Sequence, residues 1–193
     1  MAVQGLNKAV EDEVRQACRK LDASDSILIV VDSRLLHEAI THTVDYMLSR
    51  DTYGLYVSLN KPHDIVKSML HRACVKTERL YFVDCVSPLV HKALTKHDEH
   101  LIYSSNPNDL VSDGRIPQEV ERFIKSLPGE KFILIDALRT LFIYNEPEMA
   151  SSFIHSLLSL TSRHELKIIA LTRNDDAALL SMVSKAFDEV YSI

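Results

Sequence analysis

Glycine is scarce in this chain. Only 4 of the 193 residues are glycine, and none lies between Gly5 and Gly54. Lysine is likewise absent between Lys20 and Lys61. A loop that cradles phosphate needs glycine, both for left-handed backbone torsions and for close approach of the backbone to the ligand. The connection between the first expected strand and the helix that follows it, near residue 32, therefore cannot be a glycine-rich phosphate loop.

Cysteine and positive charge are also sparse. The three cysteines, Cys18, Cys74 and Cys85, form no C-x-x-C pair, which argues against a disulfide framework or a zinc site and favours a reduced, cytoplasmic setting. The formal net charge is -5, with lysine and arginine scattered along the chain, so we expect no direct nucleic-acid partner. No stretch approaches the ~20 apolar residues that cross a bilayer, so we expect no membrane association.

Short β-branched runs alternate with segments of helical period, and this pattern predicts parallel β-α-β units. The expected strands are residues 27–31, 55–59, 80–83, 101–103, 132–135, 167–171 and 189–191. We therefore predict an α/β fold of three layers, in which helices flank a mostly parallel central sheet. The length suits one domain over residues 1–193, with an N-terminal helix in 1–24 and the α/β core in 25–193.

An amphipathic helix follows the first strand. Its apolar residues from Leu35 to Leu48 form one stripe, and Asp32 stands where its carboxylate caps the helix. The opposite face, expected to be exposed to solvent, carries His37, Glu38, Thr41, His42 and Asp45.

Two histidine-containing segments invite comparison with metal sites. In HEAITH, residues 37–42, the second histidine is five residues from the first and lies about 140° further round the helix, so the two rings cannot share a metal. HKALTKHDEH offers His97, Asp98, Glu99 and His100, but without a recognisable ligand spacing. We predict a solvated helix face and a solvated turn, and no metal site.

Two other helices carry specific expectations. In NEPE, Asn145 and Glu148 have the spacing of a capping box, which predicts a helix start at Asn145. The N-terminal helix, Leu6 to Leu21, has one apolar face. That face either packs on the chain's own sheet or docks to a partner.

The segment FILIDALRTL ends a buried strand in Asp136. An acidic residue at the carboxyl end of a parallel strand lies where ligands bind in such sheets. In P-loop NTPases it orders the magnesium shell. A strand-ending or helix-capping role fits the fragment equally well.

Polar residues follow several of the expected strands, and the carboxyl ends of parallel strands share one edge of the sheet. The candidate ligand-binding residues at this edge are Ser33, Arg34, Asn60, Lys61, Asp84, Ser87, Asp136, Arg139, Thr172 and Arg173. Four of them are cations, which would make the edge locally basic and suited to a small anion.

The order of these segments resembles the RecA-like ATPase core of the KaiC/RadA/GvpD group, which includes many single-domain archaeal relatives. The resemblance covers residues 27–193. It is carried by GLYVSLNKPHDIVKSM, RLYFVDCVS, FILIDALRTLFIYNEPEMASSFIHSLLSL and IIALTRNDDAALLSMVSKAFDEVYSI.

The sequence departs from that family at two places. The phosphate loop of the family corresponds here to DSRLLHEA, which has no glycine or lysine and places the negative Asp32 where phosphate would bind. The family's pair of glutamates, which resemble the residues that activate water, corresponds to Asn60 and Lys61, and neither is a general base at neutral pH. We therefore expect no catalytic residues and no cofactor, with weak binding of ATP and Mg²⁺ left open.

Two functions follow. The chain is either a non-hydrolysing pseudo-ATPase that serves as a regulatory or assembly module, binding a protein partner or itself, or a protein that binds a small anionic ligand or nucleotide at the sheet edge. A receiver-like signalling domain is less well supported. It would need an acidic pair after the first strand and a late lysine, where the sequence has only Asp32 and Arg173.

Overall fold

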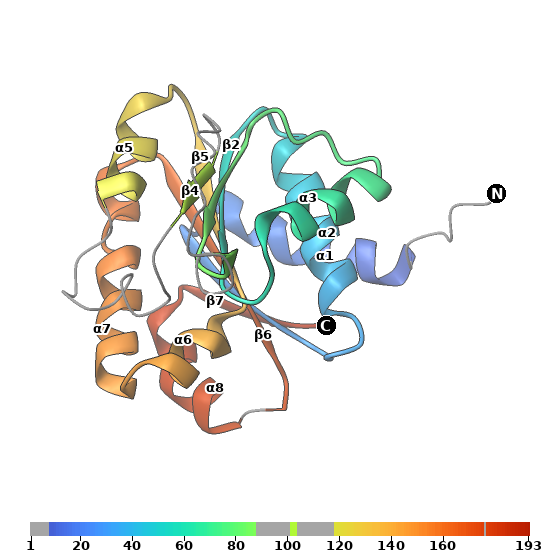
Figure 1. Ribbon diagram of the computed structural model, residues 1–193. Helices are drawn as coiled ribbons and strands as arrows, with labels where there is room; N and C mark the ends of the chain where they lie inside the picture. The colour runs from blue at the N-terminus through green and yellow to red at the C-terminus, as the bar shows by residue number, and fades with distance from the viewer. Residues whose placement is uncertain (1–7, 88–100, 104–117, 176) are drawn as a thin grey trace.

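The computed structural model describes residues 8–87, 101–103, 118–175 and 177–193 (Figure 1). The polar segment at 97–100 and the Asn- and Pro-rich segment after Ser104 lie outside this range.

Seven strands form one sheet, and every recorded pairing is parallel. The strands are β1 (Ser26–Val31), β2 (Tyr53–Ser58), β3 (Leu80–Asp84), β4 (Leu101–Tyr103), β5 (Lys131–Asp136), β6 (Leu166–Arg173) and β7 (Glu189–Ser192). Their spatial order is β4-β3-β2-β5-β6-β1-β7. All seven coincide with predicted strands to within two residues at either end.

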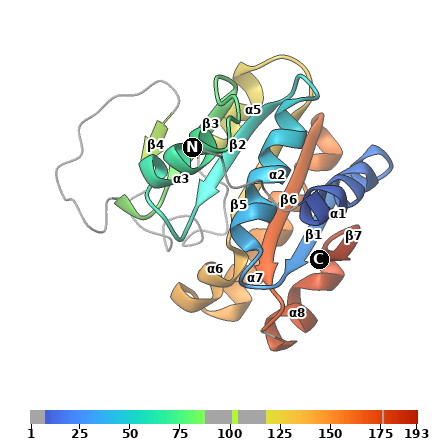
Figure 2. The ribbon, with the colours of Figure 1, turned by 90° about the vertical axis from the view of Figure 1, so that its right-hand side faces the viewer.

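Helices cover both faces of the sheet, which confirms the predicted three layers. Figure 2 shows one face, covered by α1 (Lys8–Arg19), α2 (Leu36–Leu48) and α3 (His63–Arg72). The other face is covered by α5 (Gln118–Ser126), α6 (Leu138–Tyr144), α7 (Pro147–Leu158) and α8 (Ala177–Val183). Short 3₁₀ turns lie at Lys20–Asp22, Thr161–Arg163 and Ser184–Ala186.

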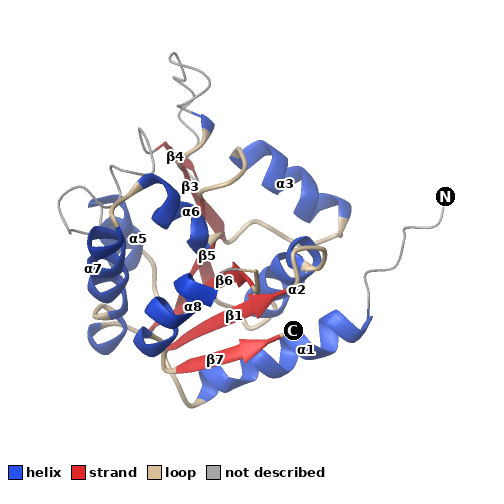
Figure 3. Cartoon of the chain, turned by 90° about the horizontal axis from the view of Figure 1, so that it is seen from below, coloured by secondary structure: helices blue, strands red, loops and turns tan. Residues whose placement is uncertain are grey.

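Strands β1 and β5 are buried along their whole length, because side chains that alternate across a strand enter two apolar clusters. In β1, Leu28 and Val30 enter the cluster shared with α5 to α8. Ile27 and Ile29 enter the cluster shared with α1 to α3. At the edge of the sheet, β1 and β7 run side by side in the same direction (Figure 3).

Helix α1 packs against α2, and this corrects the prediction for the polar face of α2. Thr41 and His42 are buried, although the sequence pattern placed them in solvent. The α1 residues that turn inward are Val10, Val14, Ala17 and Cys18. The apolar face of α1 is therefore used within the fold, so the packing interpretation is right and this face does not serve for docking.

Two helix starts also differ from prediction. Helix α2 begins at Leu36 without a side-chain cap, because the Asp32 carboxylate binds the loop before it. Helix α7 begins at Pro147 after Glu146, also without a side-chain cap. Asn145 instead ends α6, where its side-chain amide donates to the carbonyl of Leu141 at 2.8 Å.

The packing of α1 predicts the effect of truncating its central valine. Val14 is fully buried, so Val14→Ala should lower the free energy of unfolding by about 2 kcal/mol, measured by urea denaturation. Asp12→Ala, on the exposed face of the same helix, is the matched control and should change it by less than about 0.5 kcal/mol. Equal effects of the two substitutions would show that α1 is not packed on the core.

Candidate functional site

Asp84 is a structural carboxylate at the end of β3. It is fully buried and accepts hydrogen bonds from the backbone amides of His63 (2.9 Å), Val86 (2.8 Å) and Ser87 (2.8 Å). The Ser87 hydroxyl and the His63 Nδ1 lie 2.6 and 3.0 Å from its Oδ2. Burial raises the pKa of Asp84, but these hydrogen bonds outweigh it and hold the pKa below its ordinary value. Asp84 and Ser87 thus join β3 to the start of α3.

Asp136, at the end of β5, has a different environment. Its side chain is only 2% exposed, and the Tyr56 hydroxyl of neighbouring β2 donates to Oδ2 at 2.5 Å. Burial raises the pKa of Asp136, and the hydrogen bonds from Tyr56 and Asn60 and the charges of Lys61 and His37 offset this only in part. Burial together with the Asp136 charge also raises the pKa of Tyr56 well above its usual range.

Residues 59–62, here called the β2–α3 strap, fold over the end of β5. The Leu59 amide donates to the backbone carbonyl of Asp136 at 2.8 Å. The Ser58 hydroxyl donates to the carbonyl of Lys61, and the Thr140 hydroxyl of α6 donates to the Asn60 side chain. These bonds hold the Asn60 side chain and the backbone of Lys61 at the end of β5.

The connection from β1 to α2 satisfies its own hydrogen-bonding groups. The Asp32 carboxylate accepts the Arg34 amide at 2.9 Å and both Nε and Nη2 of the Arg34 guanidinium at 3.0 Å. The Leu35 amide donates to the Asp32 carbonyl at 2.9 Å. The Arg34 guanidinium lowers the pKa of Asp32 to about 2, so Asp32 stays ionised and paired with Arg34 at neutral pH. Ser33, between them, is exposed.

Two further arginines share one acid. Asp175, beyond the end of β6, lies 3.4 Å from Nη1 of Arg139 and also pairs with Nη2 of Arg173. The Arg173 guanidinium holds the pKa of Asp175 below its usual value. Thr172 is fully buried, and its hydroxyl has no partner among the described residues.

The predicted edge residues thus fall into separate groups. The structure brings Asn60 and Lys61 to Asp136, brings Arg139 and Arg173 to Asp175, and leaves Ser33 and Arg34 with Asp32. All three arginines of the expected basic edge pair with carboxylates, Arg34 with Asp32 and the other two with the single acid Asp175. The described residues hold no group of three or more His, Cys, Asp or Glu arranged to bind a metal ion.

Sequence reasoning missed Tyr56, Thr140 and His37 as members of the Asp136 cluster. Tyr56 had a usable signal: it lies within a buried strand, two residues before the strand end, and a buried tyrosine hydroxyl needs a partner. The strand register pairs Ser58 with Asp136, which sets that hydroxyl near the carboxylate. Thr140 and His37 depend on how α6 and α2 pack, which local patterns do not reveal.

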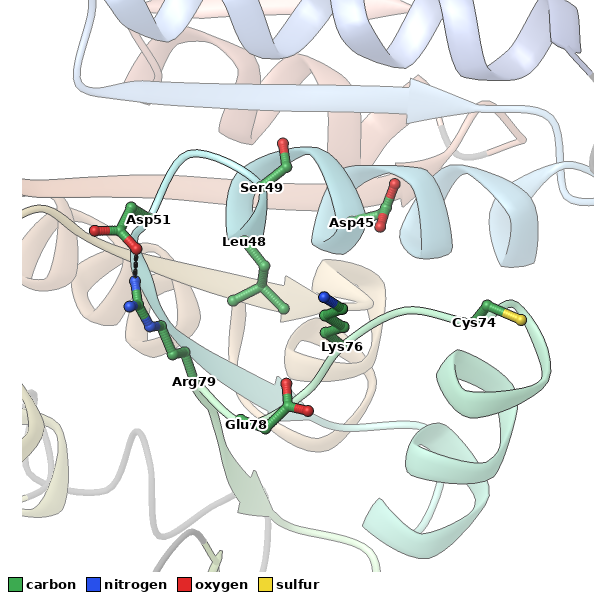
Figure 4. A pocket seen from close by; sticks show the side chains of 8 residues that line it. All are labelled: Asp45, Leu48, Ser49, Asp51, Cys74, Lys76, Glu78 and Arg79. Carbon is green, nitrogen blue, oxygen red and sulfur yellow. Dashed lines mark hydrogen bonds and ion pairs between the residues drawn. The ribbon is translucent and has the colours of Figure 1, made fainter.

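A hollow of about 520 Å³ lies at the opposite edge of the sheet, where β2 and β3 begin (Figure 4). Its lining is Asp45, Leu48, Ser49, Asp51, Cys74, Lys76, Glu78 and Arg79. The charges are mixed, and Arg79 pairs with Asp51 at one end (Figure 4). Cys74 is exposed, whereas Cys18 and Cys85 are buried, and all three are free thiols as predicted.

Comparisons with known proteins show the fold. No family model matches the chain, and no curated protein matches its sequence. Among solved structures, an uncharacterised protein from Pyrococcus horikoshii in complex with an unknown peptide is 14% identical with a TM-score of 0.60, over 90% of this chain and 82% of that one. An ATPase domain is 12% identical with a TM-score of 0.56, over 98% of this chain and 83% of that one. From these two structural similarities, the chain has the predicted α/β fold, that of a RecA-like ATPase domain.

None of the described helices is long and apolar enough to span a membrane.

The two buried aspartates predict stability effects of opposite sign. Ionised Asp84 stabilises the fold above its unfolded pKa of about 3.9, and that contribution is lost as pH falls. Asp84→Asn should therefore cost roughly 1–3 kcal/mol at pH 7. Asp136 has a raised pKa, so its ionisation costs stability as pH rises, and Asp136→Asn should raise the melting temperature at pH 7.

Urea and thermal denaturation of both variants at neutral pH and below about pH 4 would test this, because both differences should shrink in acid. If Asp136→Asn destabilises the protein as much as Asp84→Asn does, the ionised Asp136 carboxylate stabilises the fold, and the predicted difference in sign between the two variants is wrong.

Proposed function

We propose that this protein is a non-hydrolysing pseudo-ATPase of the KaiC/RadA/GvpD group and acts as a regulatory or assembly module. The observation that carries the proposal is the Asp32 carboxylate seated on the Arg34 amide. In a phosphate loop the backbone amides stay available for the ligand's oxygens. Here the Asp32 carboxylate already accepts a hydrogen bond from one such amide, that of Arg34.

The Asp32 loop opposes phosphate in two ways. Its amides are satisfied by Asp32, so phosphate would gain few hydrogen bonds there. The Asp32 carboxylate and its Arg34 partner also occupy the start of α2, where a helix dipole would otherwise attract a polyanion. A nucleotide would have to displace Asp32 from both the amide and the guanidinium of Arg34.

The β2–α3 strap adds a second obstacle, this time to hydrolysis. Asn60 does not titrate, and its side-chain oxygen is engaged by the Thr140 hydroxyl. Lys61 is a cation and cannot accept a proton from water. The positions that would activate water therefore supply no base.

The role as a module is supported by exposed apolar side chains at the junction of α6 and α7. Ile143, Tyr144 and Met149 are 65%, 52% and 40% exposed. Large apolar side chains gathered at a surface are typical of protein-binding sites. The solved Pyrococcus horikoshii protein of the same fold is in complex with a peptide, which agrees with protein binding by such a domain.

Binding of a small anionic ligand is the second candidate. Its support is Lys61, which forms no ion pair within 4.0 Å with the described residues, whereas Arg34, Arg139 and Arg173 pair with carboxylates. One lysine next to a buried aspartate is a poor anion site. We therefore favour the module.

Nucleotide binding and turnover test the pseudo-ATPase proposal. Titration of the full chain with ATP and Mg²⁺ should give no saturable heat, and phosphate release should equal that of a blank. Asp136→Asn, in which the buried carboxylate is removed, is the control and should give the same background. Turnover by the wild-type chain that disappears in Asp136→Asn would overturn the proposal.

Self-association tests the assembly role. Sedimentation of the wild-type chain over a wide concentration range should show a rise in average mass. The double substitution Ile143→Ser and Tyr144→Ser should suppress that rise, while Ile65→Ser on α3, also 50% exposed, should not. A monomer at every concentration would remove self-association as the assembly mode.

A further inference from the structure

We propose that α1 is a pH-sensitive cover over α2, and that it is released when His42, which lies buried beneath it, takes up a proton. The two helices lie side by side on the same face of the sheet (Figure 2). This inference goes beyond the proposed function and does not depend on it, because it concerns the contact between two helices and involves no nucleotide.

The imidazole of His42 is buried with one nitrogen unsatisfied. The side chain is only 6% exposed, and Nε2 has no hydrogen-bond partner among the described residues. A neutral imidazole has one donor nitrogen and one acceptor nitrogen, whereas the protonated ring donates from both. Protonation at this position would therefore bury a charge and an unmatched donor, which is costly in an apolar interior.

Helix α1 keeps this part of α2 from solvent. Val10 and Val14 of α1 enter the same apolar cluster as Ala39 and Ile40 of α2. The amphipathic pattern of α2 alone places His42 on the polar face of the helix, and α1 packs over that face. Closure of α1 and burial of a neutral imidazole are thus the same event, so a proton on His42 opposes closure.

Charged groups from both helices face His42. Glu11 and Arg15 belong to α1, whereas Glu38 and Asp45 belong to α2. Glu11 is already bound to Arg15, with Nη2 and Oε1 2.9 Å apart. Burial lowers the pKa of His42, and the three carboxylates offset this only in part.

The direction of the pH effect follows from this lowered pKa. When α1 is open, His42 is exposed to water and has the ordinary histidine pKa of about 6.5. Above that pH the imidazole is neutral in both states, and α1 stays closed. Below it the open state binds a proton that the closed state resists, so the open state gains population by up to about tenfold for each pH unit.

The other polar bonds of α1 lead to the edge strand β7 (Figure 3). The Tyr191 hydroxyl lies 2.8 Å from Glu13 and 3.1 Å from Gln16, and Lys20, just after α1, pairs with Glu189 at 2.8 Å. These bonds tether the helix to β7 and not to α2. Release of α1 from α2 is therefore a local opening that leaves the sheet intact.

Hydrogen exchange of the full chain at pH 7.5 and 5.5, corrected for the intrinsic effect of pH on amide exchange, tests the inference. A free helix of 12 residues is marginal in water, so the amides of α1 exchange once it is released. In the wild-type chain the opening equilibrium of α1 should be roughly three- to tenfold larger at pH 5.5. The amides of α7 should show no such change.

Substitutions of His42 identify the group that titrates. His42→Gln should give the same α1 opening at both pH values, because glutamine carries no titratable proton. His42→Leu should do the same, and it covers the case that the glutamine variant folds poorly. His155→Gln, at an exposed position on α7, is the matched control and should keep the wild-type response.

A nuclear magnetic resonance titration of the wild-type chain measures the same group directly and should place the pKa of His42 below about 6.5. The inference is overturned by equal α1 opening at the two pH values, by an equal rise in α7, or by a rise that survives in both His42 variants. A pKa of His42 at or above 6.5 would overturn it as well.

Discussion

The buried carboxylate of Asp136 is the constraint around which the carboxyl edge of the sheet is organised. An ionised group in an apolar interior must be matched by donors and positive charge or it destabilises the fold. Tyr56 supplies a donor from the next strand, and Asn60 of the β2–α3 strap supplies another. The strap is in turn held by α6 through Thr140. One acidic side chain thus links β5, β2 and α6.

Other charged side chains of this edge pair with one another. Asp32 neutralises Arg34 at the start of α2, and Asp175 is shared by Arg139 and Arg173 after β6. The fold of a RecA-like ATPase domain is present, and these ion pairs are what its carboxyl edge holds among the residues described.

The sequence predicted the sheet well because its signals are local. Apolar β-branched runs identify all seven strands of the described sheet. The errors arise where a tertiary partner decides. The helical pattern predicted that His42 is exposed, but α1 covers it. The same pattern predicted that Asp32 caps the helix, but its carboxylate binds Arg34 instead. The hydrophobic pattern of the strands could not predict that Arg139 and Arg173 pair with Asp175, because that pairing depends on how α6 packs against the end of β6.

A crystal structure of the chain soaked with Mg²⁺ and a non-hydrolysable ATP analogue tests the central claim most directly. The account predicts the Asp32 carboxylate still on the Arg34 amide, the Tyr56 hydroxyl still on Asp136, and no phosphate at the start of α2. Phosphate oxygens on the Arg34 or Leu35 amides, with a magnesium ion facing Asp136, would contradict it.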